Sequence, residues 1–394
     1  MTDLFDALAT TAARDTAEMF RMLADSLRER RRWHALFDLR LLEARAALGL
    51  PAAGDLSAVD PARRDALDER SLAACREVGW PLLDEGAVAA GWMYLRAAAE
   101  PDAVARKLRE LAARPPADDE AADTRRQEIV HVALWEGLDP ALGLELVLAS
   151  QGTCNAITAY EQAVARLPAP RQQAAAAILV DHLHREVLEN LRVDLARRGL
   201  VPAPTPSASI PDLLAAAGGL DNDPSVHVDV SHLQSVLRIA RVATDRDVVE
   251  KAWELAVYAA RLPAEATYPG EPPFENVGEA SRLFYGAQLG RDAEAAVRFF
   301  RAAAANARIE QAGALPADIL VLLLWRLGRP AEALHAALER PADDGMPSLV
   351  QATGMVPSLL ELARAGDALD VLRAACRDRG DEITFAATYV AGRA

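Results

Sequence analysis

Acidic residues recur three positions before histidines in this sequence. Four of the seven histidines lie three residues after a carboxylate, whereas chance supplies about one such pair at this acid content. The pairs are Glu128/His131, Asp181/His184, Asp229/His232 and Glu332/His335. Residues at i and i+3 share a helix face, so each pair can present an imidazole and a carboxylate together. Helical metal proteins use these side chains as ligands. An ordinary surface ion pair has the same spacing, so both interpretations stay open.

The densest group of possible ligands is His227, Asp229 and His232. Ser231 and Gln234 have the spacing of a capping box, which predicts a helix beginning at His232 after an extended lead-in. The positive end of that helix would keep His232 neutral. Two histidines and one carboxylate suit iron(II) or zinc. The alternative is a helix cap in which Asp229 satisfies backbone donors and both histidines lie on the surface.

A second candidate group begins with Glu128 and His131. Their Glu-x-x-His spacing is the one that carboxylate-bridged di-iron helical bundles use. That pattern requires a second such pair, for which the sequence offers Asp181 and His184, so the di-iron pattern is incomplete. An ion pair on a helix surface explains Glu128 and His131 as well.

A third group lies on one predicted helix, where His182 and Glu186 are one turn apart and His184 lies on a neighbouring face. An exposed polar face is the alternative. If the three groups converge, His227, Asp229 and His232 are the predicted metal ligands. The residues predicted to complete or orient that shell are His131, Glu128, His182 and His184. The predicted acid or base is Glu136 or Glu186.

Composition excludes several classes of protein. The net charge of −15 predicts repulsion from phosphate backbones, and therefore no nucleic-acid partner. Three widely spaced cysteines form no CxxC motif, which fits a reducing compartment. The amino terminus lacks the pattern of a signal peptide, and the most apolar run, 319–325, is far shorter than the roughly 20 residues that span a bilayer. We therefore expect a soluble, cytoplasmic protein with no membrane partner.

The composition also predicts the class of fold. Hydrophobic residues make up 51% of the 394 residues and aromatic residues only 5%, with alanine, leucine and arginine dominant. These residues favour helices, and period-2 alternation is scarce, so we expect an all-α protein. The run 82–95, for example, is predicted to form a single helix.

An internal repeat occupies the last third of the chain. Leu-Gly-Arg-x-x-Glu-Ala occurs at 289–295 and again at 327–333, and a weaker copy lies at 364–369. The three glycines, Gly290, Gly328 and Gly366, are therefore spaced evenly between amphipathic stretches. Glycine at such a place can adopt the left-handed conformation that ends a helix. A repeated helix–turn–helix unit is typical of an α-solenoid.

On the Leu-Gly-Arg-x-x-Glu-Ala turns and the small alanines that follow them, residues 278–385 resemble the tetratricopeptide-repeat superfamily. The resemblance implies stacked antiparallel helical hairpins with a concave groove. We expect an amino-terminal helical region at 1–115, a central region at 116–205 that carries acid–histidine pairs, and tetratricopeptide-like repeats at 225–394. Long loops are expected near 200–225 and 262–277.

Two functions follow from these patterns. In the first, histidines and carboxylates line a central pocket, and the protein is an enzyme that uses a divalent metal, iron or zinc, to act on a small molecule. In the second, the chain is a non-catalytic tetratricopeptide-like scaffold whose groove binds a protein or peptide. The enzyme requires its ligands to be buried and convergent, whereas the scaffold leaves them scattered.

Overall fold

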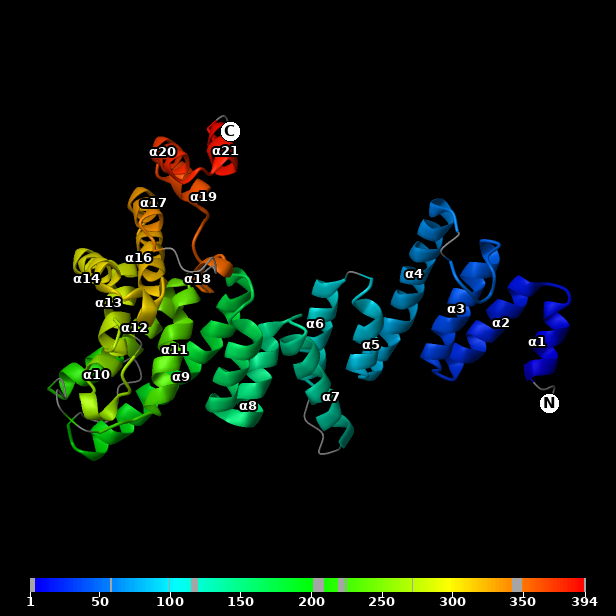
Figure 1. The fold of residues 1–394 in the computed structure, drawn as a ribbon. Helices are drawn as coiled ribbons and strands as arrows, with labels where there is room; N and C mark the ends of the chain where they lie inside the picture. The colour runs from blue at the N-terminus through cyan, green and yellow to red at the C-terminus, as the bar shows by residue number, and fades with distance from the viewer. Residues whose placement is uncertain are drawn as a thin grey trace. The chain divides into compact units, whose positions relative to one another are not determined.

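The computed structural model describes residues 4–56, 59–98, 100–114, 120–200, 209–218, 223, 225–270, 272–341 and 349–392. All regular elements within these ranges are helical, so the predicted all-α class is confirmed (Figure 1). The chain folds as two compact units, Met1–Leu146 and Val147–Ala394. None of the described helices combines the length and the apolar character needed to cross a membrane.

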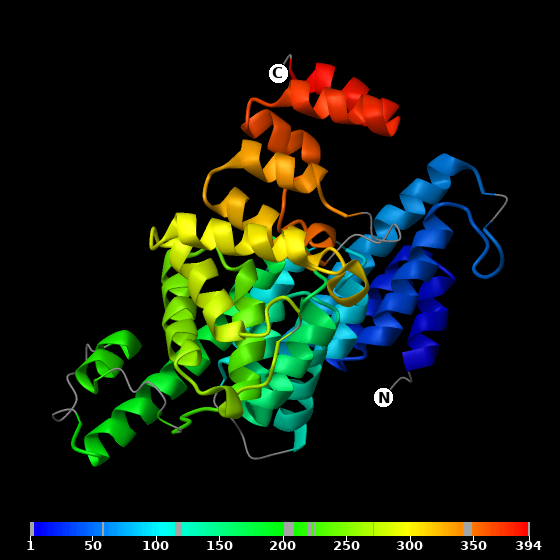
Figure 2. The same cartoon turned by 60° about the vertical axis from the view of Figure 1, so that its left-hand side comes forward.

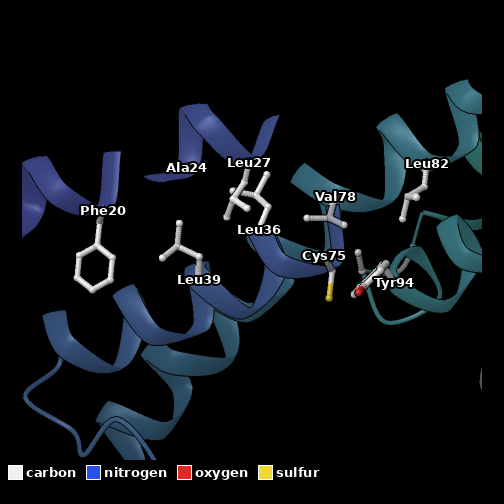
Figure 3. Close-up of a cluster of buried hydrophobic side chains, with 10 residues drawn as sticks. Phe20, Ala24, Leu27, Leu36, Leu39, Cys75, Val78, Leu82 and Tyr94 are labelled. Carbon is white, nitrogen blue, oxygen red and sulfur yellow. The ribbon is translucent and has the colours of Figure 1, made fainter. Parts of the chain in front are cut away.

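The first unit consists of helices that pack on their neighbours in the sequence. These are α1 (Leu4–Ala12), α2 (Thr16–Glu29), α3 (Trp33–Ala47), α4 (Pro61–Glu85), α5 (Val88–Leu95), α6 (Pro101–Ala112), α7 (Glu120–Val130), the π-helical turn η1 (His131–Trp135) and the start of α8 (Pro140–Ala159). A buried cluster from α2 to α5 forms one core of this unit (Figure 3). Leu36 and Val78 lie at its centre and are completely buried.

A tight hairpin replaces the single helix predicted for 82–95. Helix α4 ends at Glu85, Gly86 adopts a left-handed conformation with φ of 88°, and α5 begins at Val88. The two helices then cross closely, because a Cβ atom at Gly79 would lie 2.5 Å from Cγ of Leu95. The prediction was wrong because the apolar run continues through the turn and masks it.

The second unit begins within α8 and continues to the carboxyl terminus. Its further elements are η2 (Tyr160–Val164), α9 (Ala169–Arg197), α10 (Ile210–Ala216), α11 (Val230–Ile239), η3 (Ala240–Val242), α12 (Arg246–Ala260), η4 (Ala264–Ala266), α13 (Val277–Gln288), α14 (Ala293–Asn306), α15 (Ile309–Ala312), α16 (Leu315–Arg326), α17 (Pro330–Leu338), α18 (Leu349–Ala352), α19 (Leu359–Ala365), α20 (Leu369–Arg379) and α21 (Glu382–Ala391). Helix α9 contacts α10, α11 and α12, and α12 packs along α13.

The two segments predicted to be long loops have different secondary structure. Within 200–225, the short helix α10 interrupts the predicted loop, since Ser209 and Asp212 form a reciprocal capping box at its start. Residues 201–208, 219–222 and 224 lie outside the described part of the chain. In the connection between α12 and α13, the described residues 262–270 and 272–276 contain one short helical turn, η4.

The three repeated glycines lie between helices, as the repeat predicts, but they differ in conformation. Gly290 and Gly328 are left-handed, with φ of 81° and 70°, whereas Gly366 has φ of −94° and the following Asp367 is left-handed. Gly366 is required for a different reason, because a Cβ atom there would lie 2.6 Å from the backbone nitrogen of Ala331. Figure 2 shows the helices from α13 onward following one another toward the carboxyl terminus.

Ion pairs join these helices across successive turns. Arg291, which follows Gly290, donates to Glu250 of α12 at 2.6 Å and stacks over Trp253. At the equivalent position of the next turn, Arg329 donates to Glu294 of α14. The third turn has Asp367 at this position, so the series of arginines ends there.

Candidate functional site

In the first unit, the three predicted site residues stabilise helix ends and surfaces. The carboxylate of Glu128 accepts a hydrogen bond of 3.0 Å from the backbone N–H of Ala89, in the first turn of α5. Glu136 accepts one of 2.7 Å from the indole of Trp92, and its other oxygen lies 3.6 Å from His131 Nε2. His131 is well exposed, with 59% of its side chain accessible. A capping carboxylate and an exposed ion pair suffice to explain these contacts.

His182 and Glu186 lie on α9 near a kink in α8. Gly152 interrupts α8 with φ of 81° and ψ of 179°, and the next residue, Thr153, has its hydroxyl 3.0 Å from His182 Nε2. Glu186 lies 3.8 Å from the same nitrogen, so the predicted i,i+4 pair is present but long. Both side chains are about one-third exposed.

His184 lies closer to α12 and forms a more buried contact. Its Nε2 is 2.9 Å from Glu254 of α12, and each of the two side chains is only 12% exposed. The same Glu254 oxygen accepts a hydrogen bond from the backbone N–H of Ile210 at the start of α10. This carboxylate therefore joins α9, α10 and α12.

His227 forms the most enclosed of the histidine sites. Only 5% of its side chain is exposed, and its Nε2 lies 3.2 Å from the Asp194 carboxylate on α9. On the other side of the ring, Nδ1 lies 2.9 Å from the Tyr258 hydroxyl of α12, and the Arg261 guanidinium lies 3.3 Å from the same nitrogen. The backbone N–H of His227 also donates to Tyr258 at 2.8 Å.

The surroundings of His227 favour its neutral form. Burial lowers the pKa of His227, and the Arg261 guanidinium lowers it further, although the Asp194 hydrogen bond opposes them. Burial alone would raise the pKa of Asp194, but hydrogen bonds from His227, Arg197 and Arg198 outweigh it and lower that pKa. Burial raises the pKa of Tyr258. The neutral imidazole then donates from Nε2 to Asp194 and accepts the Tyr258 hydroxyl proton at Nδ1.

A shallow hollow of about 520 Å³ borders this network. It is lined by Asn190, Val193, Asp194, Arg197, Ser225, Val226 and His227. Asn190 donates to the backbone carbonyl of His227 at 2.8 Å, and Arg198 pairs with both Asp194 and Asp223. These contacts fix the segment that precedes α11 against α9 and α12.

Asp229 and His232 are placed differently from the prediction. Helix α11 begins at Val230, with Asp229 as its N-cap, so the predicted capping box between Ser231 and Gln234 and the predicted start at His232 were wrong. The Asp229 carboxylate accepts from the backbone N–H groups of Ser231 and His232 and from the Ser231 hydroxyl. These bonds lower the pKa of Asp229. His232 is half-buried in the first turn of α11.

None of the four acid–histidine pairs at i and i+3, all of them within the described residues, is joined directly by an ion pair. Each acid instead contacts a different group: Glu128 the α5 backbone, Asp181 the Lys251 ammonium, Asp229 the α11 backbone and Glu332 the Arg301 guanidinium. Over the described ranges, no group of three or more histidine, cysteine or acidic side chains could hold a metal ion. His227, Asp229 and His232 therefore contact separate partners, and the metal centre stays a prediction.

The partners that tertiary packing provides could not be found from the sequence. The most buried contacts of the predicted histidines are made to residues distant in sequence. Glu254 contacts His184, and His227 contacts Asp194, Tyr258 and Arg261. The only local signal was the spacing of Asp194 with Arg197 and Arg198 on one helix. The chain was also compared with known proteins, and no family model, curated protein or solved structure matches it.

Proposed function

We propose that the protein is a non-catalytic helical-repeat scaffold that binds a partner protein, and that the outer face of α21 is part of the binding surface. The proposal includes the tetratricopeptide-like stacking of hairpins. Stacking is supported by the repeated turns, and by the arginine that follows each of the first two glycines and reaches back to a glutamate of an earlier helix.

The observation that carries the proposal is the apolar outer face of α21. Ile383 and Val390 are 82% and 72% exposed, and the exposed Ala386 lies between them at helical spacing. Tyr389 beside them is 47% exposed. An exposed cluster of large apolar side chains marks an interaction site.

The opposite face of α21 is already occupied. Thr388 is completely buried and accepts a hydrogen bond of 2.9 Å from Arg373 of α20. Arg377 of α20 lies over the ring of Phe385, and Phe385 in turn packs against Tyr389. The helix is therefore held in one orientation, which keeps Ile383 and Val390 directed away from α20. An amphipathic helix of the partner, with an apolar stripe at i, i+3 and i+7, is the complement of this face.

The local roles of the predicted site residues are consistent with a scaffold. Glu128 and Asp229 satisfy helix N-termini, and the buried His184 and His227 join neighbouring helices. Such contacts position helices without requiring a substrate. The first of the two predicted functions, a metal-dependent enzyme, would be favoured by near-stoichiometric iron or zinc in the purified protein that is lost in His227→Ala.

Affinity capture with the full-length chain tests the proposal. Tagged wild type, Ile383→Glu/Val390→Glu and the control Leu42→Glu/Ile309→Glu are expressed in the native cell. All four positions are exposed, so each variant should fold. We expect wild type and the control to retain the same stoichiometric partner, and the α21 variant to lose it. The proposal is contradicted if all three chains recover the partner equally, or if none recovers a stoichiometric partner. If the wild type instead forms a dimer that the α21 substitutions break, the partner is a second copy of this chain.

A further inference from the structure

The connection between α12 and α13 encloses a cavity that none of the predicted functions uses. Its volume is about 320 Å³, at the lower end of the range for small-molecule sites. The buried side chains of Val230, Leu233, Leu262 and Val277 form much of its wall. Val230 and Leu233 come from α11, Val277 is the first residue of α13, and Leu262 begins the connection that follows α12.

Several contacts hold this wall in place. The side-chain amide of Gln234 donates to the backbone carbonyl of Tyr268 at 2.6 Å, which attaches the connection to α11. Gly270 donates to the carbonyl of Glu275 at 2.8 Å within the connection. Phe274 is buried against Phe300 of α14, with ring centroids 5.6 Å apart. The connection is therefore attached to α11 through Tyr268 and to α14 through Phe274.

The approach of α12 to α13 keeps the base of the cavity in place. A Cβ atom at Gly278, one of the lining residues, would lie 2.6 Å from the backbone nitrogen of Ala260. The two helices are thus in backbone contact at this point. Closing the cavity would require movement of packed helices rather than of a single side chain.

Gln234 is a largely buried polar residue in the wall of the cavity. Only 8% of this residue is exposed, and it lines the cavity. Because its NH₂ group donates to Tyr268, its oxygen assignment is fixed by that contact. Among the described residues, no hydrogen bond is made to this oxygen, and it is not one of the buried atoms that lack a partner. It is therefore open to solvent, and a ligand N–H or O–H can donate to it in place of water.

The charge around the cavity excludes strongly charged ligands. Glu275, which is exposed, is the one ionisable residue that lines it among those the structure describes, and no arginine, lysine or histidine does so there. An anion would meet this carboxylate without a compensating cation, and an ammonium group would lose its hydration against an apolar wall. An uncharged ligand avoids both costs.

We propose that the cavity between α11, α12 and α13 binds a small uncharged ring compound, which donates one hydrogen bond to the side-chain oxygen of Gln234. The ring contacts the apolar wall, and the donor group replaces water at the side-chain oxygen of Gln234. This inference is independent of the protein partner at α21, because the two sites share no residue.

Titration of the full-length protein with indole tests the site. Indole is an uncharged ring with one N–H, and 1-methylindole is nearly the same shape without that donor. Ala264 lines the cavity but is exposed, so Ala264→Phe should fill the cavity without disturbing the fold. Ala305→Phe, at an exposed position on α14, is the matched control.

We expect saturable binding of indole by wild type and by Ala305→Phe, and binding at least about tenfold weaker by Ala264→Phe. The hydrogen bond predicts that 1-methylindole binds wild type about two- to tenfold more weakly than indole. The proposal is overturned if indole fails to saturate wild type within its solubility, or if Ala264→Phe binds it equally well. Equal affinity for the two probes overturns the role of Gln234. Ile383→Glu/Val390→Glu should bind indole as wild type does.

Discussion

The imidazole of His227 is enclosed by groups that favour opposite protonation states. Asp194 favours the charged ring, while burial and Arg261 favour the neutral one and prevail, so the pKa is lowered. Around it, Tyr258 is also buried and Asp223 is held by Arg198. Protonation would remove the acceptor for the Tyr258 hydroxyl and place a second positive charge beside Arg261. The neutral ring is thus part of what holds the segment before α11.

This arrangement predicts a loss of stability in mild acid. Since the pKa of His227 is lower in the folded than in the unfolded chain, the unfolded chain binds the proton first. The free energy of unfolding should therefore fall as the pH decreases below about 6.5. In His227→Gln, the free energy of unfolding should fall less between these pH values. Urea unfolding at about pH 7.5 and about pH 5.5 measures the difference. His131→Gln, at an exposed site, is the control. An unchanged pH dependence in His227→Gln would contradict the assignment.

Asp229 allows a helix cap to be distinguished from a metal ligand. Its carboxylate accepts from two backbone N–H groups of α11, and an asparagine oxygen can do the same. We therefore expect Asp229→Asn to unfold nearly as wild type does and Asp229→Ala to lose about 0.5–2 kcal/mol. Thermal or urea unfolding measures both. If Asp229→Asn were as damaging as Asp229→Ala, the negative charge rather than the cap would be required.

At the scale of elements, two glycines at equivalent positions of the repeat are required for different reasons. Gly290 has positive φ and open space around it, while Gly366 has an ordinary φ but meets the backbone of α17. Asparagine tolerates the left-handed conformation, so Gly290→Asn should cost less than Gly290→Ala, which should cost about 1–2 kcal/mol. At Gly366 both changes should be damaging, by about 1–3 kcal/mol or more. Chemical unfolding of the four variants measures this, and recovery by asparagine at Gly366 would contradict the steric explanation.

The sequence predicted helices and repeated turns better than it predicted contacts. Helix composition and the evenly spaced glycines are local properties, and both are present in the structure. The break at Gly86 was missed because apolar residues continue on both sides of it. The start of α11 was misplaced because Asp229 and Ser231 can both cap a helix, and the carboxylate accepts from both backbone donors as well as from the serine hydroxyl.

The sequence identified residues of the candidate site but not the contacts that they make. His184 and His227 are correctly identified as unusual, and both are largely buried. Their partners, Glu254, Asp194 and Tyr258, come from helices whose packing the sequence does not reveal. Asp181 lies three residues before His184 on the same helix, but α12 provides a different partner for each of them, Lys251 for Asp181 and Glu254 for His184.

At the scale of the whole molecule, the polar contacts that join helices involve other residues than the exposed apolar face of α21. The buried histidines and the arginine–glutamate pairs connect helix to helix within the second unit. The apolar face of α21 has no such role there, since its most exposed side chains point away from α20. A partner that covers this face would bury Ile383 and Val390, each worth about 1.5–3 kcal/mol.

The affinity of the captured partner for the purified chain tests this claim most directly. Isothermal titration calorimetry would compare wild type, Ile383→Glu/Val390→Glu and Leu42→Glu/Ile309→Glu. We predict unchanged affinity for the control and a loss of about thirtyfold or more for the α21 variant, because two buried apolar anchors are replaced by charges. An α21 variant that binds as tightly as wild type would show that the partner is recognised elsewhere and would contradict the proposed role of this face.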